Sequence, residues 1–136
     1  MSESLQKRLK HKLNDLDRIT SHSQWVANEY KTRIKSSVVA HPLLSDNCNT
    51  VFARYPLIAH DKDTLLKQAQ KANVELADWY STPIHPLEKK DWHFVHYENG
   101  SCPNAEKRCK QVVTLPVHPA VKQHDIDCAV KFLKEV

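Results

Sequence analysis

The spacing of apolar residues predicts that the chain begins with one long amphipathic helix over residues 3–35. Leucines recur three and four residues apart, which places them on one face of a helix, and no proline or glycine interrupts the stretch. Ser21 and Ser23 would allow a bend near the middle of this helix. The leucine stripe, as we call this face, consists of Leu5, Leu9, Leu13 and Leu16.

Shorter apolar segments follow, and their period alternates between that of a strand and that of a helix. Residues rich in Val, Ile and aromatic side chains predict strands near 50–59, 74–80 and 112–117. Residues 36–48 and 84–100 are predicted to be irregular. Further helices are predicted over 62–72 behind the N-cap Asp61, from Ser101 or Cys102 with Pro103 in the first turn, and from Val121 or Asp125 onward, burying Ile126, Val130 and Phe132 or Leu133.

This order of elements predicts an α+β fold. A small antiparallel sheet of about three strands, covered by helices on one face, buries the apolar side of every element. A chain of 136 residues is expected to form a single domain over 1–136, in which the long helix at 1–35 precedes an α+β body at 36–136.

Composition narrows the classes of partner. Hydrophobic residues make up 40% of the chain and charged residues 26%, and the formal net charge is +4. The lysines and arginines are spread along the chain, which argues against a nucleic-acid partner. No apolar run approaches the roughly 20 residues of a membrane span, and the first residues lack the apolar core of a signal peptide. We therefore expect a cytoplasmic protein without a membrane partner.

Glycine and cysteine usage exclude several kinds of site. The chain has a single glycine, Gly100, so a dinucleotide-binding or P-loop motif is not possible. The four cysteines lack CxxC spacing and are expected to be free thiols, with Cys102 and Cys109 serving as small apolar residues. Cys–His nucleophilic catalysis stays open, because spatial proximity is not visible in a sequence. The metal-capable side chains of His85, His93, His96 and Cys102 form only one closely spaced pair, so we predict no metal site.

The C-terminal third carries the most specific motifs. The run from Cys102 to Pro119, CPNAEKRCKQVVTLPVHP, is followed by Asp125-Ile-Asp127 at the start of the last helix. Upstream lies Trp79-Tyr-Ser-Thr-Pro-Ile-His-Pro86, and the first helix contains Leu13-Asn-Asp-Leu-Asp-Arg18. Together these motifs resemble the C-terminal, or small, domain of the DegT/DnrJ/StrS family of pyridoxal-phosphate-dependent sugar aminotransferases. The resemblance covers nearly the whole chain.

The resemblance implies where a substrate would bind. In this family the small domain packs against a large cofactor-binding domain and lines one wall of the substrate cleft. By resemblance, the substrate-binding residues are Tyr80, Ser81 and His85, with Pro83 and Ile84 between them. A tyrosine hydroxyl and an imidazole are able to hydrogen-bond sugar hydroxyls or phosphate oxygens. The alternative is that Tyr80 and His85 are solvated side chains without such a role.

The resemblance also implies what is missing. The family's Schiff-base lysine precedes the long helix and would therefore lie before Met1, and no lysine of this chain stands in a matching motif. We assign no catalytic residue, and we expect no cofactor to be bound by this chain alone, although the full-length family uses pyridoxal phosphate. The lone chain is therefore predicted to be without transaminase activity. The alternatives are a binding module for a sugar nucleotide or a protein, and one half of a split aminotransferase.

Without a large domain, apolar surface would be uncovered. We expect a homodimer or a large domain to cover it, with the leucine stripe at the centre of the interface. The alternative is that the stripe packs onto the chain's own sheet and leaves a monomer.

Overall fold

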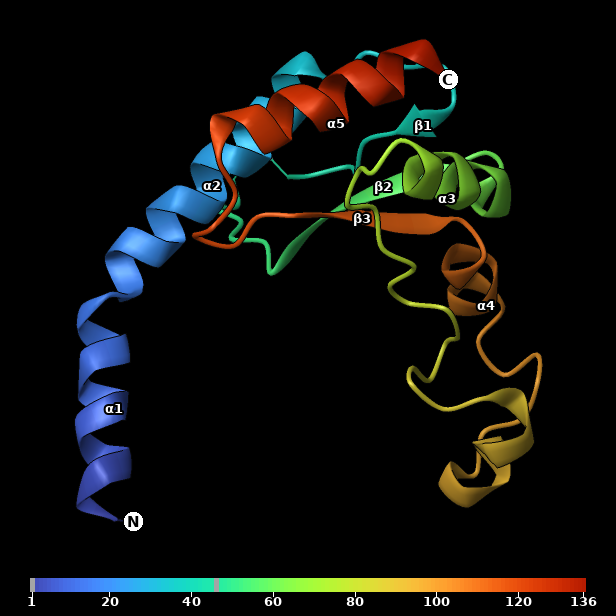
Figure 1. The fold of residues 1–136 in the computed structure, drawn as a ribbon. Coiled ribbons are helices and arrows are strands. Elements are labelled where there is room, and N and C mark those ends of the chain that lie inside the picture. The colour runs from blue at the N-terminus through green and yellow to red at the C-terminus, as the bar shows by residue number, and fades with distance from the viewer. Residues whose placement is uncertain (1, 46) are drawn as a thin grey trace.

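The computed structural model describes residues 2–45 and 47–136 and has an α+β fold (Figure 1). A small antiparallel sheet packs against helices, as the sequence predicts. The elements are, in chain order, helix α1 (Glu3–Asn14), helix α2 (Leu16–Arg33), strand β1 (Val39–Ala40), strand β2 (Arg54–Ala59), helix α3 (Lys62–Lys71), the 3-10 helix η1 (Lys89–Val95), helix α4 (Pro103–Cys109), strand β3 (Val112–Pro116) and helix α5 (Gln123–Glu135).

The sheet has the order β1-β2-β3, with antiparallel pairing throughout. Leu57 lies opposite Val113 and Tyr55 opposite Leu115, so large apolar side chains pair across the two main strands. Along β2, buried positions alternate with half-buried ones, as the pleat of a strand requires. Because the buried set includes Tyr55, Leu57 and Ala59, this face of β2 belongs to the core.

The predicted strand over residues 74–80 is wrong. Only Ala77 pairs with the sheet, through an isolated antiparallel bridge to Thr114. Beyond Ala77 the chain leaves the sheet edge, because the Asp78 side chain and the Tyr80 carbonyl turn toward the ammonium group of Lys62. The third strand is β1 instead, within the stretch 36–48 that the sequence predicts to be a loop.

Helices α2, α3 and α5 supply the rest of the core. Figure 1 shows α2 and α5 crossing above the sheet, and the two helices contact each other. The last helix buries the residues that the sequence predicts: Ile126, Val130, Phe132 and Leu133 are all inside. Its first turn is closed by Asp125, whose Oδ2 accepts a hydrogen bond from the backbone N–H of Lys122 at 2.8 Å. Asp61 caps α3 as predicted, with its Oδ1 accepting from the N–H of Thr64 at 3.1 Å.

The predicted single long helix is broken into two helices at Asp15, not at Ser21 or Ser23. Asp15 forms an ion pair with Arg18, one turn into α2, at 3.4 Å. Ser23 is buried instead, and its hydroxyl donates a hydrogen bond to the carbonyl of Val117 at 3.1 Å. The second helix therefore belongs to the body of the fold, whereas the first leads away from it (Figure 1).

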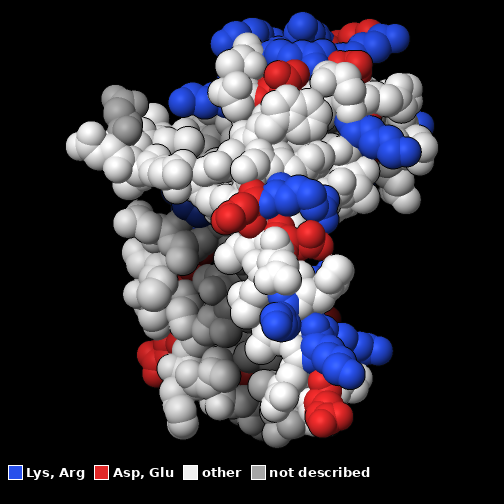
Figure 2. Space-filling view, turned by 90° about the vertical axis from the view of Figure 1, so that its left-hand side faces the viewer, with Lys and Arg blue, Asp and Glu red and all other residues white. Residues whose placement is uncertain are grey.

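None of the residues of α1 is buried. The leucine stripe is exposed along its whole length, with 47–59% of each residue accessible to solvent, and it does not pack onto the sheet. Figure 2 looks onto the side of the molecule where α1 lies and shows its basic side chains gathered toward one edge, with uncharged atoms over much of the rest. This helix is therefore amphipathic without an apolar partner in the described chain.

A second segment also leaves the body. Residues 84–101, which include η1, project on the same side of the sheet as α1 (Figure 1). Phe94 within η1 is 73% exposed, whereas Trp92 is buried. Within the described residues, no helix has the combination of length and apolar character needed to cross a membrane.

Candidate substrate-binding segment

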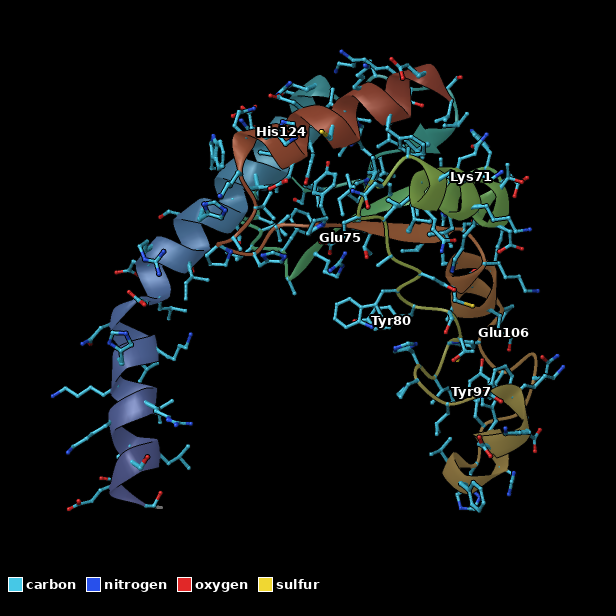
Figure 3. All side chains as sticks on the ribbon, in the orientation of Figure 1. Lys71, Glu75, Tyr80, Tyr97, Glu106 and His124 are labelled. Carbon is cyan, nitrogen blue, oxygen red and sulfur yellow. The ribbon has the colours of Figure 1, made fainter. Side chains whose placement is uncertain are left out.

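The structure brings together the three residues predicted to bind substrate. The Ser81 hydroxyl and the Nδ1 of His85 lie 3.2 Å apart, and the rings of Tyr80 and His85 lie 5.4 Å apart in an edge-on arrangement. The ring of Trp79 lies 5.1 Å from that of Tyr80 and is tilted against it by 35°. Tyr80 is 53% exposed, and Figure 3 places it below the sheet, where α1 and residues 84–101 project. These side chains offer hydroxyl and imidazole groups to a polar ligand.

Two contacts attach this segment to the body. On its N-terminal side, Ala77 exchanges backbone hydrogen bonds of 2.9 Å with Thr114 of β3. Close to Tyr80, the Lys62 ammonium forms an ion pair with Asp78 and donates to the carbonyl of Tyr80 at 3.4 Å. Lys62 and Asp78 were not predicted from the sequence. In the sequence each is only a charged residue within an apolar pattern. The ion pair between them arises from tertiary structure, which such a pattern does not show.

One carboxylate binds two points of the projecting segment, residues 84–101. Glu106 of α4 accepts hydrogen bonds at Oε1 from the Tyr97 hydroxyl at 2.8 Å and from the backbone N–H of Gly100 at 2.6 Å (Figure 3). These hydrogen bonds, that of Gly100 foremost, lower the pKa of Glu106. Desolvation and the neighbouring Glu106 raise the pKa of Tyr97 to about 12. The ring of Trp92 packs edge-on against Tyr97 at 5.0 Å, which completes a small cluster at this end.

A cavity of about 360 Å³ lies elsewhere, between the first turns of α5 and the residues that follow α3. Figure 3 shows His124, which lines it, on α5 above the sheet, whereas Tyr80 lies below the sheet. Cys128 also lines the cavity, and its Sγ lies 3.5 Å from the Nε2 of His124. Burial raises the pKa of Tyr30, which closes one wall and donates a hydrogen bond to the Pro116 carbonyl. The predicted substrate-binding residues do not line this cavity.

The metal-capable side chains do not converge. Over residues 2–45 and 47–136, no group of three or more His, Cys, Asp or Glu side chains is arranged to hold a metal ion. The Nδ1 of His93 is instead hydrogen-bonded to the Lys90 carbonyl at 2.8 Å. All four cysteines are free thiols. Cys109 is buried as a small apolar residue, but Cys102 is exposed at the N-terminal end of α4, so the expected role is wrong for Cys102.

A pyridoxal cofactor needs a lysine whose amine is free to form a Schiff base. Lys62 is the one lysine with a buried side chain in the described part of the chain. Its ammonium is bound by Asp78, by the carbonyl of Cys109 at 2.6 Å and by that of Tyr80. Because all three of its hydrogens have an acceptor, Lys62 does not fit the role of a Schiff-base lysine.

The fold is shared with solved chains that are about three times as long as this one. The sequence model of the DegT/DnrJ/EryC1/StrS aminotransferase family matches residues 2–134, and the chain belongs to this family.

Two curated relatives are similar to the chain. The "Pleiotropic regulatory protein" of Geobacillus stearothermophilus is 26% identical over 129 residues, which cover 91% of this chain and 34% of the relative. The UDP-2-acetamido-2-deoxy-3-oxo-D-glucuronate aminotransferase of Pseudomonas aeruginosa is 27% identical over 96 residues, covering 71% of this chain and 25% of the enzyme. The chain thus spans about a third of one relative's length and a quarter of the other's.

Solved structures show the same fold. The S. venezuelae DesV structure, in complex with a ketimine intermediate, aligns with a TM-score of 0.81 at 20% identity over 93% of this chain and 34% of its own. A DegT DnrJ EryC1 StrS aminotransferase from Brucella abortus aligns with a TM-score of 0.75 at 24% identity, over 92% of this chain and 33% of its own. In both, the aligned part is about one third of the solved chain.

Proposed function

We propose that this chain serves as the small domain of a pyridoxal-phosphate-dependent sugar aminotransferase and forms one wall of its substrate cleft. The observation that carries the proposal is the family match over residues 2–134, in a chain that spans only 34% of the longer-aligned curated relative. In this proposal Tyr80, Ser81 and His85 face the substrate. The cofactor and its lysine come from residues outside these 136, because Lys62 has its hydrogens engaged.

The proposed substrate class is a nucleotide sugar. The Pseudomonas relative is named for a UDP-linked amino-sugar derivative, which supports this class. A Tyr80 hydroxyl and a His85 imidazole on an exposed surface are suited to sugar hydroxyls and to the diphosphate. Serine adds a short donor and acceptor beside the imidazole, 3.2 Å from it, which holds the ring in one orientation. The arrangement favours binding and orientation rather than chemistry by this segment.

The leucine stripe is the proposed interface. Leu5, Leu9 and Leu13 of α1 and Leu16 at the start of α2 are about half exposed, and α1 buries none of its residues. Contiguous apolar surface of this kind is seldom left exposed, because burying it is favourable by roughly 25 cal/mol for each Å² removed from water. In the isolated chain we propose that a second copy covers the stripe by a two-fold contact. In a complete aminotransferase the remaining residues of the enzyme would take that place.

A graft into the Pseudomonas aminotransferase tests the proposed function. Its aligned C-terminal segment would be replaced by the matching residues of this chain, and cofactor loading would be followed by visible absorbance. We expect a loaded graft to transaminate, and a second graft carrying Tyr80→Ala and His85→Ala to load cofactor equally but to lose most of its activity. A graft that folds and loads cofactor but has no activity would argue against the proposal, as would equal activity of the two grafts.

A further inference from the structure

Lys62 occupies a position that is electrostatically unfavourable for a cation. It is the first residue of α3, and the N-terminal end of a helix carries a partial positive charge of its own. Only 6% of its side chain is accessible to solvent. Removing an ammonium group from water is unfavourable unless acceptors replace the water, so its partners must compensate for both effects.

Those partners come from two other segments of the fold. The Asp78 carboxylate forms an ion pair with the ammonium, and the carbonyl oxygens of Cys109 and Tyr80 accept hydrogen bonds at 2.6 and 3.4 Å. The three donors of one ammonium group thus meet three acceptors. One of these lies at the end of α4, and the other two flank Trp79. The Nζ atom of Lys62 therefore connects α3 to α4 and to the start of the substrate-binding segment.

Beyond Ala77 the segment has no further sheet pairing in the described structure, yet its side chains are ordered relative to one another. The ring of Tyr80 contacts that of His85, and Ser81 holds the imidazole. The contact that fixes the backbone immediately before Ser81 is the one from Lys62 to the Tyr80 carbonyl. Lys62 thus reaches the cluster through the backbone carbonyl of Tyr80.

We propose that Lys62 is the positioning residue of the Tyr80–Ser81–His85 cluster, and that it sets the cluster's affinity for a nucleotide sugar without contacting the ligand. The affinity part of this inference rests on the proposed function. The positioning part does not, since it concerns the order of the segment in the absence of ligand.

Four variants of the isolated chain test the inference. Lys62→Met removes the ammonium, Asp78→Asn removes its counter-charge, and Lys62→Arg keeps a cation. Lys67→Met, on an exposed position of the same helix, is the matched control. The measurements are the aromatic NMR resonances of Tyr80 and His85, the amide exchange rate of Ser81, and the resonances of Leu57 as a report on the core.

In Lys62→Met and Asp78→Asn we expect the Tyr80 and His85 resonances to move toward those of an unstructured segment. Exchange at Ser81 should rise by about tenfold while Leu57 is unchanged. Lys62→Arg should restore much of the native spectrum, and Lys67→Met should match the unmodified chain. If Lys62→Met fails to fold, Asp78→Asn decides the question. Native cluster resonances in Asp78→Asn with an intact core would overturn the proposal.

Binding of UDP-N-acetylglucosamine separates the two parts of the inference. If the unmodified chain binds this probe, Lys62→Met should weaken the affinity by about tenfold and Lys62→Arg should recover it. Equal affinity of all variants, with the cluster disordered in Lys62→Met, would overturn the affinity part. If the unmodified chain does not bind the probe, the proposed function is contradicted, and the resonances still decide whether Lys62 positions the cluster.

Discussion

The hydroxyl of Tyr97 donates a 2.8 Å hydrogen bond to Oε1 of Glu106, and the same oxygen accepts the N–H of Gly100. One carboxylate therefore closes a loop that connects the projecting segment to α4. Glu106 lies in the first turn of α4, and its side chain also binds the loop that precedes this helix. The hydrogen bonds from Gly100 and Tyr97 lower the pKa of Glu106, because they stabilise its ionised form.

Replacing Glu106 by Gln should destabilise the loop in a pH-dependent way. A lowered carboxyl pKa contributes stability that is complete above the ordinary value of 4.5 and is lost as the pH falls through the folded pKa. The difference in unfolding free energy between the unmodified chain and Glu106→Gln should thus be largest near pH 6 and shrink as the pH falls below 4.5. Urea unfolding across this range measures it. A difference that grows toward low pH would contradict the assignment.

Two groups of leucines should respond differently to truncation. Leu57 has no exposed surface and sits in the sheet, so Leu57→Ala is expected to cost about 3 kcal/mol in unfolding free energy. Leu5 is 53% exposed on α1 and should cost less than about 0.5 kcal/mol when truncated. Denaturant unfolding at micromolar concentration compares the two. Similar losses would mean that α1 packs on the body after all.

Charges in the leucine stripe should abolish self-association without unfolding the body. Because Leu9 and Leu13 are about half exposed and α1 buries none of its residues, Leu9→Glu and Leu13→Glu are expected to give a folded monomer where the unmodified chain sediments as a dimer. Ser4→Glu, an exposed position on the side of the same helix away from the stripe, adds the same charge and should remain dimeric. A monomeric unmodified chain, or a dimer that persists in both leucine variants, would refute the proposed interface.

Pyridoxal phosphate added to the isolated chain should form no site-specific Schiff base. The physical reason is that the buried lysine, Lys62, has its three hydrogens engaged, while the other lysines are exposed and unselective. Borohydride reduction followed by peptide mapping is expected to show scattered, substoichiometric labelling. Stoichiometric labelling of one lysine, with loss of a visible absorbance band, would contradict this expectation.

The helical elements were largely predictable from the sequence, because each depends on local signals. Asp61 and Pro103 mark helix starts, and the spacing of Ile126, Val130 and Leu133 marks a buried face. The main strands were also predictable, although β2 begins at Arg54, later than expected. These signals act over a few residues and do not require tertiary contacts.

The errors share a tertiary cause. Residues 74–80 have the composition of a strand, but Asp78 is drawn to Lys62, sixteen positions earlier in the chain, and only Ala77 reaches the sheet. Strand β1 has two residues, too few to leave a periodic signal. At the candidate site, the resemblance pointed to Tyr80, Ser81 and His85, which do lie together, but no local pattern marks the lysine beneath them. The spacing of the apolar residues also gave no signal for the break between α1 and α2 at Asp15.

The most direct test of the account is a titration of the isotope-labelled chain with UDP-N-acetylglucosamine, followed residue by residue by NMR. The account predicts saturable shifts at Tyr80, Ser81 and His85, their loss in Tyr80→Ala, and unchanged resonances at His124 and Glu75 in the separate cavity. Shifts at His124 without any at Tyr80, or no shift at any of these residues up to millimolar ligand, would contradict the claim that this segment is the substrate-facing wall of a sugar aminotransferase.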